Sequence, residues 1–122
     1  MSLDLSRLRP QIESALAYSG GTHQYADVAE MIAAGTAVLF PGPSAAIVAE
    51  IVEHPRRRVL NIFLAAGNLK ELEAMLPLVL EWGHSKGCQS ATFIGRRGWI
   101  RLFASRDPRW TETHVMMQRQ LV

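Results

Sequence analysis

Apolar residues in the first part of the chain recur at the spacing of an α-helix. The first stripe consists of Leu3, Leu5, Leu8, Ile12 and Leu16. Pro10 interrupts it, so we expect a helix that is kinked there or begins late. A second stripe predicts a helix over residues 23–34, with Thr22 as its N-cap and Gly35 at its end.

Three apolar runs follow and are separated by turns that contain proline. They predict strands at 36–41, 45–54 and 58–65, which we expect to form an antiparallel meander. The middle run is apolar almost throughout, apart from Glu50 and Glu53. That pattern is typical of a central strand covered on both faces.

The strongest helical pattern lies at 69–86. Asn68 and Glu71 have the spacing of a capping box before its apolar face. Pro77 in the interior should bend the helix, because it removes one backbone hydrogen bond. Gly87 is placed to end it as a left-handed cap.

The rest of the chain predicts a strand at 90–94, a short amphipathic helix that Gly95 opens, and a closing strand at about 111–121. One face of that closing strand would carry Val115, Met117, Arg119 and Leu121, and the other face would carry His114, Met116, Gln118 and Gln120. The long helix would connect the strands at 58–65 and 90–94 as a right-handed crossover, which makes those strands parallel. The fold class is therefore α/β (α+β), a mixed sheet with helices on both faces.

Length and composition limit the class of protein. A chain of 122 residues is expected to form one domain, 1–122, and 48% apolar with 20% charged residues is ordinary for a globular protein. The formal charge of +2 is too small to argue for nucleic acid, and no aromatic residues for base stacking interleave the arginines at 56–58. Asp4 and Arg7 precede any long apolar run, which argues against a signal peptide, and no stretch is long enough to span a membrane.

The sequence contains no motif of the common metal-binding, nucleophilic or phosphate-binding sites. The four histidines are scattered, so we expect no metal site. Neither a nucleophile-elbow motif nor a phosphate-binding Walker motif occurs. Cys88 is the only cysteine, which excludes an internal disulfide, and it follows a helix C-terminus, where the helix dipole disfavours a thiolate. A reducing compartment fits best.

The order of elements resembles the GNAT superfamily of acyl-CoA N-acyltransferases. The most specific part is the C-terminal third, where 96–103 is similar to the short helix of that family, and 107–110 with 117–121 is similar to the turn and final strand that follow. The segments 86–88 and 95–99 resemble in particular the small GNAT-like proteins of tailed phages and prophages. The resemblance implies a GNAT-like mixed sheet and, in active members, acetyl-CoA as cofactor.

The departures from the family pattern bear on activity. The family holds the CoA pyrophosphate with a glycine-rich loop before its long helix, and here the turn 65–68 keeps one glycine, with Glu71 and Glu73 behind it. The tyrosine that usually protonates the departing thiolate is Phe103 here. Weak candidates for a catalytic base on the strands are Glu50, Glu53 and His54, and cofactor contacts would fall on Phe63, Leu64, Ala65, Gly67 and Asn68.

Two functions of different classes remain. The first is a non-catalytic GNAT-fold protein that needs no cofactor and acts through protein contacts in a phage virion or its assembly, with copies of itself or virion proteins as partners. Its expected interface combines arginine and tryptophan side chains at Arg96, Arg97, Trp99, Arg101 and Trp110. The alternative is a minimal acetyl-CoA-dependent N-acetyltransferase. Either fits a location in the cytoplasm or in a virion.

Overall fold

The computed structural model describes residues 3–95 and 97–122. Its centre is a four-stranded sheet in the order β1-β2-β3-β4. The strands are β1 (Val38–Pro41), β2 (Ala46–Glu53), β3 (Arg58–Ala66) and β4 (Ser90–Phe93). The first three are antiparallel in sequence order, and β3 and β4 are parallel. The predicted meander and the parallel pair are confirmed.

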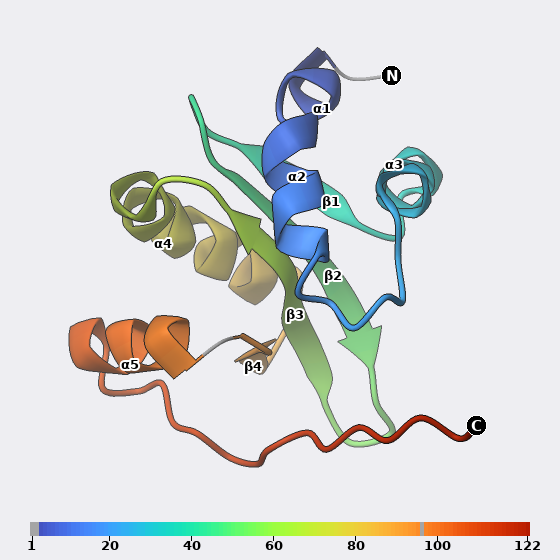
Figure 1. The fold of residues 1–122 in the computed structure, drawn as a ribbon. Coiled ribbons are helices and arrows are strands. Elements are labelled where there is room, and N and C mark those ends of the chain that lie inside the picture. Colours follow the sequence, from blue (N-terminus) through green and yellow to red (C-terminus); the bar gives the residue numbers. More distant parts are fainter. Residues whose placement is uncertain (1–2, 96) are drawn as a thin grey trace.

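Helices cover both faces of this sheet, as predicted (Figure 1). One face carries α1 (Leu3–Arg7), α2 (Arg9–Leu16) and α3 (Tyr25–Ala34). The other carries α4 (Leu69–Ser85), which connects β3 to β4, and α5 (Arg97–Arg106). None of the helices in the described residues is long and apolar enough to cross a membrane.

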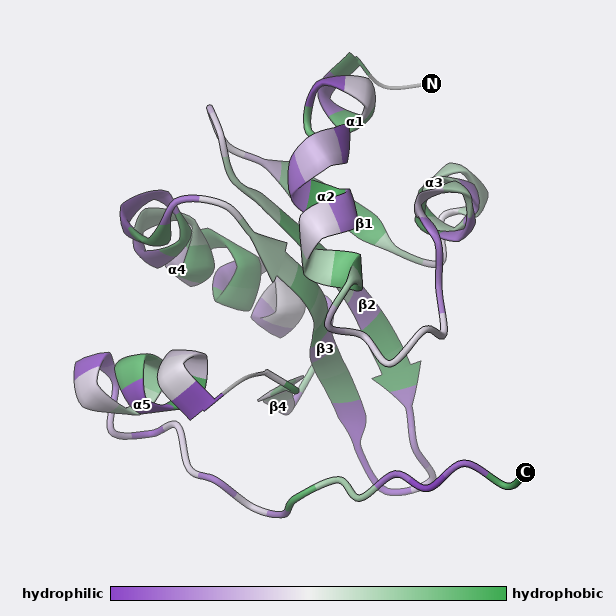
Figure 2. Cartoon of the chain, in the orientation of Figure 1, coloured by the Kyte–Doolittle hydropathy of each residue, from purple (hydrophilic) through white to green (hydrophobic). Residues whose placement is uncertain are grey.

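The sheet separates two hydrophobic clusters, and β2 contributes to both. Ala46 and Val48 pack with α1, α2 and α3, whereas Ile47 and Ala49 pack with α4. Successive side chains of a strand point to opposite faces, so a nearly continuous apolar run places one residue in each cluster in turn. Figure 2 shows this apolar character along β2 and β3, and the change to hydrophilic residues at the hairpin that joins them.

The N-terminal helices follow the sequence pattern with one correction. The interruption at Pro10 is real, because α1 ends at Arg7 and the proline stands in the first turn of α2, where its missing N–H costs nothing. Thr22 is not the N-cap of α3, so that prediction was wrong. Gln24 is the N-cap, and its backbone N–H donates to the Asp27 carboxylate at 2.8 Å. A carboxylate three residues into the helix decides where the cap falls.

The long helix α4 begins at the predicted Asn68 cap and ends at the predicted Gly87. The predicted capping box is wrong, because the Glu71 carboxylate bonds to Ser44 and not to the Asn68 backbone. The Asn68 side-chain oxygen accepts hydrogen bonds from the backbone N–H groups of Lys70 and Glu71 at 2.8 and 3.4 Å. At the other end Gly87 adopts a positive φ of 84°, and the N–H of Cys88 donates back to the Gly83 carbonyl at 3.0 Å. This pattern closes the helix and places the Cys88 thiol in the α4-side cluster.

The predicted closing strand at about 111–121 was wrong. Beyond Arg106 the chain makes a turn at Asp107 and then runs as an extended segment without helix or strand, exposed from Thr111 to Val122. The alternation of apolar and polar residues is present, but a strand also needs a neighbouring backbone to pair with. None of the four strands in the described residues pairs with this segment.

Candidate functional site

A tight turn joins β3 to α4 and shapes one wall of a groove. Gly67 has a positive φ of 105°, and a side-chain carbon at this position would lie 2.5 Å from the Ser44 carbonyl oxygen. Only glycine can hold the chain this close to its neighbour. The turn therefore keeps its single glycine for packing against the segment before β2.

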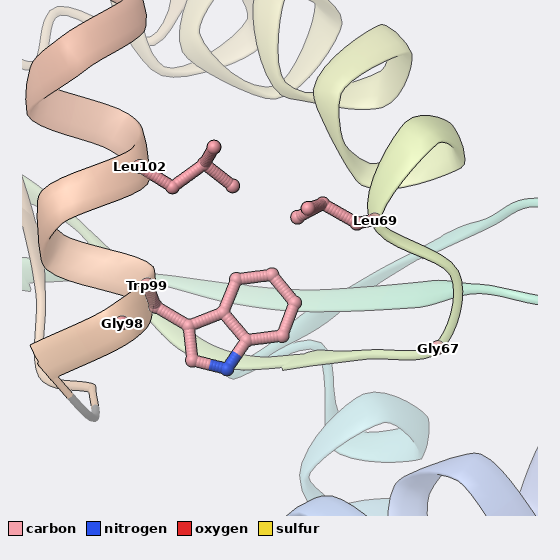
Figure 3. Close-up of a pocket in the computed structure, with 5 residues that line it drawn as sticks. All are labelled: Gly67, Leu69, Gly98, Trp99 and Leu102. Carbon is pink, nitrogen blue, oxygen red and sulfur yellow. The ribbon is translucent and has the colours of Figure 1, made fainter.

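The groove lies between this turn and α5 and has a volume of about 400 Å³. It is lined by Gly67, Leu69, Gly98, Trp99 and Leu102. Figure 3 shows Leu69 and Leu102 pointing toward each other from α4 and α5, with the Trp99 ring beside them. Its size falls within the range of small-molecule sites, and its walls are apolar.

The start of α4 has little left to offer an anion. The N–H groups of Lys70 and Glu71 already donate to the Asn68 side chain. The Glu71 carboxylate turns to Ser44, whose backbone N–H and hydroxyl donate to it, the hydroxyl at 2.7 Å. This leaves a fixed negative charge in the first helical turn, where a phosphate would otherwise be favoured.

Glu73 joins the two helices that border the groove. Its carboxylate lies 3.6 Å from the guanidinium of Arg106, at the end of α5. The Arg106 side chain is exposed and that of Glu73 is half-buried, so this ion pair contributes little stability to the contact between α4 and α5.

A bulge in β3 opens the sheet beside the groove. Leu64 pairs with Val48 and Ile62 pairs with Ala49, so Phe63 is an extra residue in β3. The pairing with β4 ends at Ile62 and Phe93, which leaves β3 unpaired on that side from residue 63 onward. Nothing in the sequence signals this bulge, because residues 62–66 are apolar throughout and fit either face.

The five residues predicted to contact the cofactor do not all lie on the same face of the sheet. Gly67 lines the groove and Asn68 caps the helix next to it. Ala65 packs with the α4-side cluster, whereas Leu64 and Phe63 pack on the opposite face, where Phe63 meets the His23 ring at 4.9 Å between centroids. Phe63 faces away by ordinary alternation after Ile62, and the bulge turns Leu64 to the same side while it brings Ala65 to the α4 side.

Phe103, at which the resemblance implies a proton donor in active relatives, is buried. Its side chain is 7% exposed and belongs to an aromatic cluster. The ring centroids of Phe93, Trp110 and Trp99 lie 5.1, 5.8 and 6.2 Å from that of Phe103. A benzene ring has no proton to donate, and these neighbours close the space around it.

Glu50, a candidate base, lies in a polar row across three strands. Asn61 on β3 donates to its carboxylate at 3.0 Å, and the Thr92 hydroxyl on β4 donates to the Asn61 side-chain oxygen at 3.0 Å. The neighbours of Glu50 in β2, Ala49 and Ile51, pack on the α4 side, so Glu50 points to the other face. Its carboxylate and the groove are therefore on opposite faces of the sheet.

The other two candidate bases lie at the β2–β3 hairpin. The Glu53 carboxylate pairs with Arg58 across the hairpin at 2.7 Å. His54 is exposed in the turn, and its backbone N–H donates to the Arg57 carbonyl at 2.9 Å. The structure does not bring these two residues to the groove.

The predicted interface residues lie on and after α5. Trp99 and Trp110 are half-buried against the Phe103 ring, while Arg97 and Arg101 are exposed. Arg96, the fifth predicted residue, lies outside the described residues.

The turn before Trp110 is fixed by an ion pair. Asp107 accepts hydrogen bonds from the backbone and guanidinium of Arg109, each at 3.0 Å, and these bonds lower the pKa of the Asp107 carboxyl. Elsewhere in 3–95 and 97–122, no three histidine, cysteine, aspartate or glutamate side chains gather as metal ligands.

The whole fold is similar to those of solved structures. An acetyltransferase from Trypanosoma brucei superposes with a TM-score of 0.66 and 14% sequence identity, covering 98% of this chain and 93% of its own. The protein TTHA1254 of Thermus thermophilus gives the same TM-score and identity, covering 98% of this chain and 92% of its own. The sequence matches no protein-family model and no curated protein. At this identity the likeness concerns the fold, which is GNAT-like.

Proposed function

We propose that this protein is a non-catalytic GNAT-fold protein that works through contacts with other protein chains. The observation that carries the proposal is Phe103. It replaces the usual proton donor and is enclosed by Phe93, Trp99 and Trp110. Acetyl transfer from a thioester needs a proton for the departing thiolate, and the side chain at this position supplies none.

The helix start supports the same proposal. Two of the N–H groups that would hold a pyrophosphate are bonded to Asn68, and the Glu71 carboxylate stands in the same turn. Each charged hydrogen bond lost to a phosphate weakens binding by about 1.5–3 kcal/mol. We therefore expect acetyl-CoA to bind weakly or not at all.

A role in a tailed-phage particle or in its assembly is the finer part of the proposal. It rests on the resemblance of the segments 86–88 and 95–99 to phage-encoded GNAT-like proteins. The partner would then be a virion protein or another copy of this chain.

A minimal acetyl-CoA-dependent N-acetyltransferase is the second candidate. The observation that favours it is the unpaired edge of β3 from Phe63 onward, next to an apolar groove of about 400 Å³. An extended ligand with amide groups can bond to such an edge, as an added strand does. Ordered water would then have to replace the missing proton donor.

Calorimetric titration of the full chain with acetyl-CoA, combined with a thiol-release assay on amine substrates, tests the proposal. We expect no saturable heat and no thiol release above the uncatalysed rate. Saturable one-to-one binding that Leu102→Glu abolishes, accompanied by thiol release, would overturn it in favour of the enzyme. Leu102→Glu places a carboxylate in the groove, and Leu78→Glu, on the exposed face of α4, is its matched control.

A further inference from the structure

The tip of the β2–β3 hairpin carries two exposed arginines, Arg56 and Arg57, which we call the hairpin arginines. Arg58, which follows them, pairs with the Glu53 carboxylate at 2.7 Å. No carboxylate in residues 3–95 and 97–122 forms an ion pair with either of the hairpin arginines. Their positive charges are therefore open to a partner outside those residues.

The backbone holds the hairpin arginines in a fixed place. The N–H of His54 donates to the Arg57 carbonyl at 2.9 Å, which closes the turn, and Pro55 restricts its backbone. The N–H of Gln89 donates to the Arg58 carbonyl at 2.9 Å, which fastens the hairpin to the loop before β4. A turn that is already ordered loses little conformational freedom when it binds a partner.

A pocket of the opposite charge lies along α3, and we call it the α3 pocket. It has a volume of about 440 Å³, and its lining includes the carboxylates Asp27 and Glu30 and the apolar side chains Met31 and Ala34. One oxygen of Asp27 accepts the backbone N–H of Gln24 at 2.8 Å. Glu30 is exposed and forms no ion pair within the part of the chain that the structure describes. No lysine or arginine lines the pocket.

We infer that the hairpin arginines of one copy of this protein bind in the α3 pocket of a second copy. The inference rests on the proposed function, because it names the partner as another copy and gives the surfaces in contact. A guanidinium group binds a carboxylate through two parallel hydrogen bonds, and Glu30 has both of its oxygens available for them in the described residues. The apolar stem of an arginine packs on surfaces such as those of Met31 and Ala34.

The two surfaces of one chain lie too far apart to meet each other. In Figure 1 the β2–β3 hairpin is at the lower end of the sheet, and α3 lies well above it, beside β1. The contact is therefore made between chains. Because it joins two different surfaces, a second copy that returns it closes a dimer, and one that does not return it continues the assembly to a further chain.

A carboxylate pocket fits the hairpin better than a nucleic acid does. Proteins that bind DNA through its phosphates make about 6–10 such contacts, whereas the hairpin offers two free arginines. Residues 53–58 also contain no phenylalanine, tyrosine or tryptophan on which a base would stack. Ion pairs near the surface are individually weak, so we expect an association that depends on concentration and on salt.

Light scattering of the full chain over a range of protein concentrations tests the inference. At about 0.01 M salt the mean mass should rise with concentration above that of the monomer. At about 1 M salt it should fall back to the monomer, because the screening length falls from about 30 to about 3 Å.

Two variants of equal charge separate the hairpin from a general effect of charge. The double variant Arg56→Ala, Arg57→Ala removes two positive charges from the hairpin. Lys70→Glu lowers the net charge by the same amount at an exposed residue outside both surfaces, so it is the matched control. We expect the double variant to be monomeric and the control to associate like the unaltered chain.

A mixing experiment tests which surface the hairpin binds. Glu30→Arg reverses the charge of the α3 pocket and leaves the hairpin intact, so this variant should also be monomeric alone. An equimolar mixture with the hairpin double variant brings one intact hairpin to one intact pocket. Native mass spectrometry should then show a heterodimer of the two variants and no larger species. Its formation also shows that both variants are folded.

Three results would overturn the inference: a monomer at every concentration, association that the hairpin double variant retains, and a mixture without the heterodimer. A monomer that binds a short DNA duplex through Arg56 and Arg57 would overturn it in favour of a nucleic-acid partner. The titration with acetyl-CoA is independent of these results. A monomer that ignores acetyl-CoA refutes the contact between copies and leaves the proposed function standing, whereas chains that associate and transfer acetyl groups do the reverse.

Discussion

At the scale of single residues, the proposed loss of catalysis depends on a few positions. Phe103 lies within an aromatic cluster where the resemblance implies a proton donor. Asn68 uses its side-chain oxygen to cap α4, which occupies N–H groups that a phosphate would need. Glu71 adds a carboxylate to the same turn. Each of these side chains makes local contacts in the fold, and under the proposed function each disfavours binding of acetyl-CoA.

Restoring a phenol at position 103 should therefore not restore activity. Phe103→Tyr supplies the missing hydroxyl, but the ring stays enclosed by Phe93, Trp99 and Trp110, and the groove still lacks donors for a pyrophosphate. A thiol-release assay with acetyl-CoA should show the background rate for both proteins. Thiol release that depends on Tyr in this variant would mean that the groove holds the cofactor after all.

Gly67 should be far less tolerant of substitution than Gly87. Both have positive φ, but a Cβ at Gly67 would meet the Ser44 carbonyl oxygen at 2.5 Å, whereas nothing lies within 4 Å of one at Gly87. Gly87→Ala should cost about 1 kcal/mol in the free energy of unfolding, from its left-handed conformation alone. Gly67→Ala should cost about 2–3 kcal/mol, since the clash adds to the strain. Urea denaturation measures both, and equal costs would contradict the close approach.

At the scale of elements, the sequence predicted the sheet and its two layers of helices better than the site. The strands β1 to β4 and the helix α4 follow from apolar periodicity and from capping signals such as Asn68 and Gly87, which act locally. The bulge at Phe63 and the unpaired course of 111–121 depend on neighbouring backbones. No periodicity within one segment carries that information.

The N-cap of α4 offers a test at this scale. Asn68→Ala removes the acceptor for two backbone N–H groups and should lower the free energy of unfolding by about 1 kcal/mol. Asn68→Asp keeps a side-chain oxygen that can accept both hydrogen bonds. It should cost little, so it is the matched control. Thermal unfolding followed by circular dichroism checks both. If the two variants were equally destabilised, the loss would come from something other than the cap.

At the scale of the whole molecule, a GNAT-like sheet carries an apolar groove and an exposed C-terminal segment. The groove between the β3–α4 turn and α5 has apolar walls, and none of the residues that line it is charged. Residues 111–122 are exposed and belong to no helix or strand. These features support the proposal that the molecule binds other protein chains and not a nucleotide cofactor.

Native mass spectrometry of the full chain in the presence of excess acetyl-CoA tests this account most directly, because one spectrum reports both the number of chains and the bound cofactor. The account predicts that no acetyl-CoA is attached, whatever the number of chains. A spectrum in which each chain carries one molecule of acetyl-CoA would contradict it.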